Sequence, residues 1–518
     1  MVCTTEYGGN RLNTAGMMLD GISHAMTFAN LLYALIGSLL GMLVGILPGL
    51  GPAAAMSIVL PVALYLPPEG GVIVMAGIYY GAMYGGSTTA VLTNIPGEVS
   101  SVVTAIDGFQ MTKQGRAGEA LAIAAIGSLI AGILGTIAIA WLGPTIASVA
   151  LSFGPTEYFG LVLFSLTALV SFSGRSIVLG LSMGLLGIGL ATVGSDPLTG
   201  APRLTFGNMQ LMKGIDIVPL TVGLFGIGEV IFSAQQKMMA VFEGTLPAWY
   251  KMLPRGTQLR RGLAASLRGT AVGGVMGLLP GMVPALTTYL AYDLEKKVGR
   301  FRHEVGHGAI EGVAAPEAAN NATAMTGFIP LLSLGIPTSP ALALILGTLI
   351  MNGVQPGPAM FTQHAALSFT VIGSMLISNA MLFILSLPLV GFWARISKVP
   401  YSVLGPIVLA VCLIGAYAPR NSMFDVYVAI GFGVIGYLMR RFDWPMSPLI
   451  LGFLMGPMLE QSMRQSLAIS NGTVGIFFTR PITAFCIAAA ALVLVVTVVI
   501  RVRAKGAAKF MADGVNEV

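Results

Sequence analysis

Charged residues are scarce in this chain of 518 amino acids: Asp, Glu, Lys and Arg make up 9% of it, whereas 55% is hydrophobic. Apolar stretches of about 20 residues recur throughout, the length that crosses a bilayer as an α-helix. Lipid offers the backbone no hydrogen-bond partners, and these stretches are longer than barrel strands. The sequence therefore predicts an all-α polytopic membrane protein with about 12 to 15 membrane segments.

Cysteine and nucleotide-binding motifs are also lacking. Cys3, Cys412 and Cys486 are far apart, which predicts neither a disulfide framework nor a thiolate metal site. No GxxxxGK[S/T] loop occurs, so the chain does not hydrolyse ATP by that route. The net charge of +6 does not indicate nucleic acid, because Lys and Arg lie between the apolar runs and signal topology there.

A repeated motif divides the chain into two halves. GILPGLGP at residues 45–52 returns as GLLPGMVP at 277–284, 232 positions later. Pro removes a backbone donor and Gly permits positive φ, so both copies predict helix breaks inside apolar sequence. Further matches pair NIPG at 94–97 with GIPT at 335–338. The residues expected to break helices are Pro48, Gly49, Pro96, Pro280, Gly281 and Pro337.

Corresponding loops of the two halves differ in charge. The turn at 66–71 has no base, whereas its counterpart carries Lys296, Lys297, Arg300 and Arg302. Because cytoplasmic loops collect Lys and Arg, this difference predicts inverted repeats with re-entrant hairpins or broken helices. The expected organisation is a polar N-terminal segment with an uncertain start (1–25), a first repeat (26–236), a basic cytoplasmic linker (237–262), a second repeat (263–462), a loop with an extra membrane helix (463–500) and a basic cytoplasmic tail (501–518).

Polar residues cluster beside the predicted breaks. Helix ends near the bilayer midplane can bind ions through backbone groups, and polar side chains at that depth mark substrate pathways. A single membrane Ser or Thr is more often a packing residue, so the prediction depends on the clustering. The predicted substrate-binding residues are Ser87, Thr88, Thr89, Asn94, Gly97, Asn320, Asn321, Thr338 and Ser339.

Acidic residues inside the apolar segments are rarer still. Glu98, Asp107 and Glu317 lie beside or between the breaks, and each is a candidate for coupling to Na⁺ or a proton. Each could equally cap a helix end. Glu311 is a related candidate, and Glu229 and Glu460 are weaker ones.

One motif favours a different class of protein. HEVGH at residues 303–307 has the spacing that places two imidazoles on one helix face around Zn²⁺, with Glu304 as base. Against a zinc protease stand Gly306 inside the would-be helix and a third ligand that would have to be Glu311, Glu317 or His364. The membrane metalloprotease therefore remains the alternative to a transporter, and a passive channel is a third reading.

Four long motifs resemble the large membrane subunit of the tripartite tricarboxylate transporters (the TctA family). They are LPGLGPAAA at 47–55, YYGAMYGGSTT at 79–89, NIPGE at 94–98 and GVAAPEAANN at 312–321, and the resemblance extends from about Met18 to about residue 500. It implies a multi-pass permease of the bacterial inner membrane, not an enzyme. The implied partners are a small membrane subunit (TctB-like) and a periplasmic solute-binding protein (TctC-like).

The expected function is cation-coupled uptake of citrate or related carboxylates. The resemblance implies Na⁺ or H⁺ as the coupling ion and no other cofactor. It also implies that proteins of this kind begin near Met17 or Met18, and that histidines at 303 and 307 are not part of the family pattern. Neither the particular carboxylate nor the oligomeric state follows from the sequence.

Overall fold

The computed structural model describes residues 14–47, 51–172, 176–235, 246–282, 284–396 and 401–515. Within these ranges the chain is almost entirely helical, and the two short strands β1 (Gly194–Ser195) and β2 (Pro202–Arg203) form one antiparallel hairpin. The predicted all-α architecture is thus confirmed. The predicted breaks at Pro48 and Gly49, like residues 1–13, lie outside the described residues.

The helices that precede the predicted linker are α1 (Thr14–Ala25), α2 (Phe28–Ile46), α3 (Pro52–Ala63), α4 (Pro68–Thr93), η1 (Val99–Ser101), α5 (Val102–Lys113), α6 (Ala117–Ala150), α7 (Pro155–Phe172), α8 (Ile177–Ala191), η2 (Met209–Lys213), α9 (Ile217–Thr221), the π-helix η3 (Val222–Ile227) and α10 (Gly228–Ser233). The π-helix joins α9 and α10 into one apolar segment.

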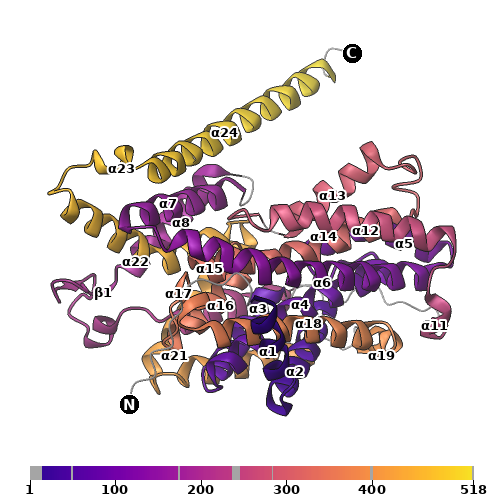
Figure 1. Ribbon diagram of the computed structural model, residues 1–518, viewed down its shortest axis with the longest axis horizontal. Coiled ribbons are helices and arrows are strands. Elements are labelled where there is room, and N and C mark those ends of the chain that lie inside the picture. Colours follow the sequence, from indigo (N-terminus) through magenta and orange to yellow (C-terminus); the bar gives the residue numbers. More distant parts are fainter. Residues whose placement is uncertain are drawn as a thin grey trace.

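The remaining helices are α11 (Trp249–Met252), α12 (Thr257–Met276), α13 (Pro284–Val298), α14 (Glu311–Thr326), α15 (Phe328–Leu334), α16 (Pro340–Met351), α17 (Ala359–Thr362), α18 (Ala365–Ser386), α19 (Val390–Ile396), α20 (Tyr401–Tyr417), α21 (Met423–Arg441), α22 (Met446–Ile469), α23 (Ile476–Thr479) and α24 (Pro481–Val515). In Figure 1, α24 extends beyond the body of the molecule. The boundaries predicted for the repeats and linker stay a prediction, although α12 begins inside the predicted linker and α22 runs past residue 462.

Six helices in the described part of the chain are long and apolar enough to cross a membrane. They are α2, α6, α7, α18, α21 and the Pro481–Val499 part of α24. Shorter apolar helices, among them α3, α8 and α16, are too short to span the hydrocarbon layer alone. Such segments fit a membrane protein whose helices are interrupted near mid-depth.

Small residues bring the central helices together. Gly37, Gly41 and Gly45 of α2 face the backbone of α4, and a Cβ added at any of them would collide with it. Gly269 and Gly273 of α12, and Gly277 directly after it, face α14 in the same way, each 232 positions after its counterpart. Without side chains in between, the two backbones of each pair reach contact distance, the usual way that membrane helices associate.

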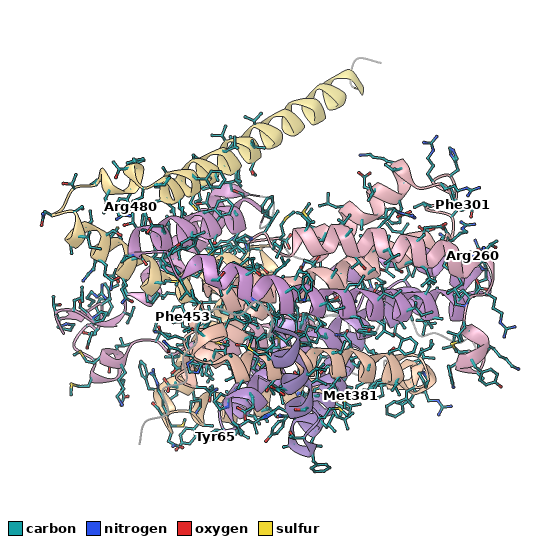
Figure 2. All side chains as sticks on the ribbon, in the orientation of Figure 1. Tyr65, Arg260, Phe301, Met381, Phe453 and Arg480 are labelled. Carbon is teal, nitrogen blue, oxygen red and sulfur yellow. The ribbon has the colours of Figure 1, made fainter. Side chains whose placement is uncertain are left out.

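Buried residues of both halves form the main hydrophobic core, whose members run in sequence from Met42 to Met455. Figure 2 shows Arg260 and Phe301 at one end of the molecule and Arg480 at the opposite end. In Figure 1, α11 and the loop after α13 lie at the Arg260 end, whereas β1 and α23 lie at the other. The base-rich segments around residues 251–261 and 296–302 therefore lie at the same end of the molecule.

Candidate functional site

Helix α4 forms one wall of the candidate site. All its residues from Gly70 to Leu92 are buried, so its hydroxyl groups face protein rather than lipid. The helix ends where Asn94 adopts a left-handed conformation with φ of 61°. Asn is one of the few residues other than Gly that tolerate this conformation, which explains its place before Pro96. The Asn94 side chain is exposed, away from the buried polar cluster described below.

The break after α4 is held against α2. Gly97 N–H donates a 3.3 Å hydrogen bond to the Gly86 carbonyl, and a Cβ at Gly97 would collide with the Gly45 carbonyl oxygen. Because only glycine fits there, the non-helical segment can turn back onto α4. This return places Glu98, which follows directly, inside the protein.

Helix α14 forms the facing wall. Every residue from Glu311 to Thr326 is buried, and the helix carries Glu317, Asn320 and Asn321. Positions i, i+3 and i+4 share one helix face, so this spacing directs the carboxylate and both amides to the same side. Polar groups of this kind at the centre of a membrane protein are costly and mark functional sites by default.

The Glu317 carboxylate receives hydrogen bonds from two helices of the first half. Ser87 Oγ on α4 donates to Glu317 Oε2 at 2.5 Å, and Thr104 Oγ1 on α5 donates to Oε1. Glu317 thus connects α14 to both sides of the Asn94–Gly97 break. In the described residues, no Lys, Arg or His lies within ion-pairing distance of it.

Glu98 is bound in a similar way. Ser100 Oγ donates to Glu98 Oε1, and Asn320 Nδ2 donates to the same oxygen at 3.1 Å. Asn321 Nδ2 reaches Ser128 Oγ on α6 at 2.7 Å. Two carboxylates from different halves of the chain are therefore surrounded by hydroxyl and amide groups.

Several buried oxygens of this cluster have acceptor capacity left over. Asn320 Oδ1, Asn321 Oδ1 and Tyr84 Oη have no hydrogen-bond partner among the described residues. Unsatisfied buried polar atoms are uncommon and call for an explanation such as a ligand, ion or water. The arrangement of neutral oxygens beside two carboxylates suits a small cation, because hard cations prefer oxygen ligands.

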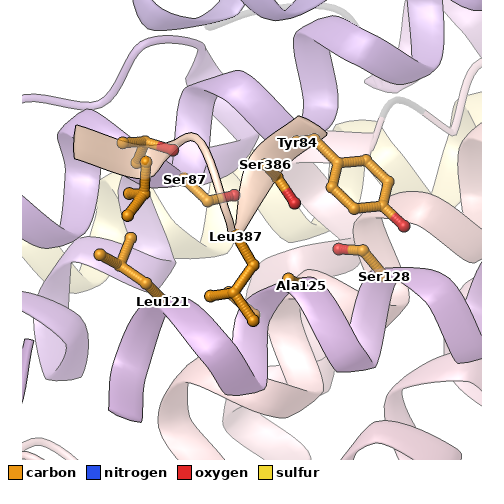
Figure 3. A pocket seen from close by; sticks show the side chains of 10 residues that line it. Tyr84, Ser87, Leu121, Ala125, Ser128, Ser386 and Leu387 are labelled. Carbon is orange, nitrogen blue, oxygen red and sulfur yellow. The ribbon is translucent and has the colours of Figure 1, made fainter. Parts of the chain in front are cut away.

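A small cavity adjoins the cluster. Figure 3 shows the side-chain oxygens of Tyr84, Ser87, Ser128 and Ser386 around it, with Leu121 and Leu387 on its apolar side. Thr88 lines the same cavity. Its volume is about 20 Å³, room for about one water molecule and not for a tricarboxylate. The site is therefore closed around its polar groups in this conformation.

The second break lies between α15 and α16. Gly335 ends α15 with φ of 73°, and Pro337 follows in the non-helical segment. Ser339 caps α16, since its Oγ accepts a 3.3 Å hydrogen bond from Leu342 N–H. Ser339 Oγ also lies 3.5 Å from Tyr79 Oη on α4, and Thr338 is buried beside Gly327. The structure thus brings the second break to the same helix, α4, that precedes the first.

The other predicted residues have local roles here. Thr89 Oγ1 lies 3.4 Å from the Gly86 carbonyl of its own helix. Pro280 and Gly281 form the turn between α12 and α13, where Gly281 has φ of 82° and packs against the Leu169 backbone. These positions support the fold around the site rather than the cluster itself.

Asp107 anchors a loop. Its carboxylate accepts hydrogen bonds from the backbone N–H groups of Gly306 (2.9 Å), Gly308 (2.7 Å) and Ala309 (2.8 Å), and from Tyr292 Oη (2.9 Å). With so many donors, Asp107 has little acceptor capacity for a coupling ion in this conformation. It joins α5 of the first half to the loop that precedes α14.

The metalloprotease alternative has no support in this geometry. Residues 303–307 form turns rather than a helix, and Gly306 has φ of 102°. Glu304 pairs with Arg261 at 2.6 Å instead of facing a metal site. No group of three or more His, Cys, Asp or Glu side chains suited to a metal was found in the residues that the structure describes.

Sequence reasoning missed several members of the cluster. Ser100, Thr104, Ser128, Tyr84 and Ser386 all lie in it or around its cavity. Thr104 carried a usable signal, because it precedes Asp107 by three positions and so shares its side of α5. Ser128 and Ser386 lie in ordinary apolar runs, where a lone Ser indicates nothing in particular.

Comparison with known proteins agrees with the resemblance seen in the motifs. A protein from Agrobacterium vitis, described as an uncharacterized 52.8 kDa protein in the TAR-I ttuC' 3' region, is 42% identical over 487 residues, covering 94% of this chain and 96% of the relative. A second A. vitis protein, from the TAR-II ttuC' 3' region, is 42% identical over 241 residues, which are 46% of this chain and all of the relative. No solved structure was found to match. The model of the tripartite tricarboxylate transporter TctA family matches residues 31–451, so this chain belongs to that family of membrane transport proteins.

Proposed function

We propose that this protein is the large permease subunit of a binding-protein-dependent transporter that takes up citrate or related carboxylates together with Na⁺ or H⁺. The observation that carries the proposal is the pair of buried carboxylates, Glu98 and Glu317. Glu98 is bound by Ser100 and by Asn320 of α14, and Glu317 is bound by Ser87 and Thr104, which lie on either side of the Asn94–Gly97 break. An ion gradient is the proposed source of energy, with another subunit as the alternative, since the chain has no GxxxxGK[S/T] loop.

A cation has a clear role between these groups. Two buried carboxylates without a basic partner in the described residues are costly in low dielectric unless a proton or metal ion neutralises them. Asn320 Oδ1 and Asn321 Oδ1 add neutral oxygens with free acceptor capacity on the same helix. Binding of the cation would allow α4 and α14 to change their contact, which couples ion binding to movement.

The anionic substrate is proposed to bind at the helix breaks. The segments at Gly97 and at Thr338 precede the N-terminal ends of α5 and α16, where backbone N–H groups favour carboxylates. Substrate and cation would then lie on neighbouring groups, and each would compensate the charge of the other. The remaining predicted binding residues, including Asn94, would contact substrate only in a more open conformation.

Alternating access is proposed to use inverted repeats. The supporting observation is that α2 packs on α4 through the same glycine pattern that packs α12 on α14. Paired elements of this kind can exchange conformations, so that one half opens to one face while the other closes. The proposed location is the bacterial inner membrane, with a TctB-like small membrane subunit and a TctC-like periplasmic binding protein as partners.

Uptake of a labelled carboxylate panel led by citrate tests the function. Cells with and without this gene, with the partner genes intact, are compared in Na⁺ medium, in choline medium and at two external pH values. Gene-dependent accumulation against a gradient, abolished by removing one cation, is the expected result. If the protein reaches the membrane and no carboxylate accumulates, the proposal is wrong. Gene-dependent equilibration without accumulation against a gradient would indicate a channel, and accumulation without any cation dependence would indicate another energy source.

The site is tested by Asn321→Ala and Asn94→Ala. Loss of uptake at normal expression is expected for Asn321→Ala, because the amide joins α14 to Ser128 of α6 one helical turn from Glu317. If both variants transport normally, the proposed site is in the wrong place, whatever the substrate.

A further inference from the structure

A large crevice lies at the base-rich end of the molecule, apart from the small cavity beside Glu317. Its volume is about 740 Å³, within the range of roughly 300 to 1,000 Å³ that is typical of ligand-binding clefts. Its walls come from α13, the loop after it and one residue of α5. The lining residues are Ile106, Tyr292, Lys296, Lys297, Arg302, His303, Val305, Gly306 and His307.

The crevice is rich in positive charge that the protein does not neutralise. Lys297 pairs with Asp293 at 2.7 Å, but Lys296 and Arg302 form no ion pair with any described residue. The acidic residue of the loop, Glu304, pairs with Arg261 and so compensates a different base. Both unpaired bases are exposed. The crevice therefore attracts anions, and several bases within one cleft favour a ligand with more than one carboxylate.

Helix α5 connects this crevice to the buried carboxylates. Thr104 donates to Glu317, Ile106 lines the crevice and Asp107 binds the crevice wall through Gly306. These three positions lie within one turn of a helix, which rises about 5.4 Å per turn. The crevice thus begins about one helical turn from the proposed transport site.

The wall between the two is a loop held by hydrogen bonds. Gly306, Gly308 and Ala309 are bound to Asp107, and Gln114 Nε2 donates to the His307 carbonyl at 2.9 Å. Hydrogen bonds of this kind can be exchanged with water when α5 moves. The same loop leads directly into α14, which carries Glu317.

We propose that the crevice is the cytoplasmic vestibule of the transport pathway, a second and weaker site that receives the polycarboxylate as it leaves the Glu98 and Glu317 region. This proposal rests on the proposed function, because it takes the transported anion as its ligand. Lys296 and Arg302 bind the carboxylates, and the loop bound to Asp107 separates the vestibule from the transport site until α5 moves.

Thiol labelling of Ile106→Cys tests the vestibule. The variant is made in the full complex with Cys3, Cys412 and Cys486 replaced by Ser, and is presented in inside-out vesicles to a membrane-impermeant maleimide. Ile106 is 40% exposed in the crevice, so the new thiol can react. Citrate at saturating concentration is expected to slow labelling about tenfold, the effect of a site that is about 90% occupied.

Charge variants decide whether the bases hold the anion. Lys296→Gln with Arg302→Gln is expected to remove the protection, since each lost charge-assisted contact costs about tenfold or more in affinity. The matched control is Arg255→Gln with Arg260→Gln, which removes two exposed bases that do not line the crevice. If citrate still slows labelling in the Lys296 and Arg302 double variant, or if its effect is lost equally in both double variants, the proposal is overturned.

Two further measurements distinguish citrate from a lipid headgroup as the ligand, and the vestibule from the proposed transport function. Labelling is compared in vesicles of phosphatidylcholine and in vesicles that also contain phosphatidylglycerol. If the anionic lipid slows labelling of Ile106→Cys in the absence of citrate, the crevice binds a lipid headgroup and the proposal is overturned. Uptake is measured on the same preparations. Cation-coupled uptake without citrate protection overturns the vestibule alone, whereas protection without uptake supports the anion site and overturns the proposed function.

Discussion

Ser87 Oγ donates a 2.5 Å hydrogen bond to Glu317 Oε2, joining α4 to α14 across 230 positions of the sequence. Each of these helices packs through glycines on its own partner, α2 or α12. The hydrogen bond is thus a link between two glycine-packed helix pairs at the level of the buried carboxylates. A change in the charge of Glu317 would alter this hydrogen bond directly. Ion binding at Glu317 would therefore change the contact between the two halves of the chain.

Replacing Glu317 by Gln should reduce uptake by more than tenfold while the protein still folds. Gln keeps the size and an acceptor for Ser87 but cannot bind a coupling cation by its charge. Initial rates of carboxylate uptake at matched expression provide the measurement. Glu119→Gln is the control, because its partially exposed pair with Arg116 should contribute less than about 1 kcal/mol. Normal, cation-dependent uptake by Glu317→Gln would contradict the coupling role.

Gly97→Ala should destabilise the protein. An added Cβ would meet the Gly45 carbonyl oxygen and the Gly86 backbone, neither of which can move without shifting a helix. Such overpacking costs about 1 to 3 kcal/mol. Thermal unfolding in detergent measures the effect. The control Gly274→Ala has nothing within 4 Å and lies inside α12, so it should unfold at the same or a higher temperature.

Asp107→Asn should loosen the loop at Gly306 to Ala309. The amide keeps one acceptor oxygen but loses the charge that strengthens the backbone hydrogen bonds, each worth about 1.5 to 3 kcal/mol when the acceptor is charged. Trypsin cleavage after the exposed Arg302 should become faster, and faster still in Asp107→Ala. Asp293→Asn, which breaks an exposed pair with Lys297, is the control. Unchanged cleavage in Asp107→Ala would show that Asp107 does not hold the loop.

The stability of the loop that contains the β1 and β2 hairpin should decrease at acidic pH because of Asp196. Backbone N–H groups of Leu198 and Thr199, helped by Arg464, lower the pKa of its carboxyl group to about 2. Because the folded pKa lies below the unfolded value of about 4, this contribution is present above about pH 4 and is lost as the pH falls to about 2.

Limited pepsin digestion between pH 2 and pH 5 measures that dependence. Leu198, Leu204 and Phe206 are exposed in this loop and provide cleavage positions. Wild type should be cleaved more slowly than Asp196→Asn at pH 5, and the difference should vanish near pH 2. If the ratio of the cleavage rates of wild type and Asp196→Asn stayed the same from pH 2 to pH 5, the assignment to Asp196 would be contradicted.

Part of the site could be predicted because its residues are polar where apolar residues are expected. Glu317, Asn320 and Asn321 stand out in any reading of α14, and the Pro and Gly residues near 96 and 335 indicate breaks. Asn94 shows the limit of that reasoning. Its position beside the break suggested a ligand-binding amide, yet its left-handed backbone and exposed side chain give it a structural reason to be there.

Partners across long distances in the sequence could not be predicted. Asp107 looked like a coupling acid, but the loop that fills its acceptor positions lies about 200 residues later. HEVGH likewise looked like a metal motif until the backbone at Gly306 proved non-helical. For Asp107 the deciding contacts come from a loop whose position no local pattern specifies.

The sequence by itself determined the class of protein and the helix breaks near residues 96 and 337, because these depend on hydrophobicity and backbone conformation over a few neighbouring residues. Only the tertiary structure decided which carboxylates share donors, which acid holds a loop and where the basic residues enclose a crevice. Those properties depend on distances between helices that are far apart in the chain, and hydrogen bonds and charge interactions form only when such helices meet.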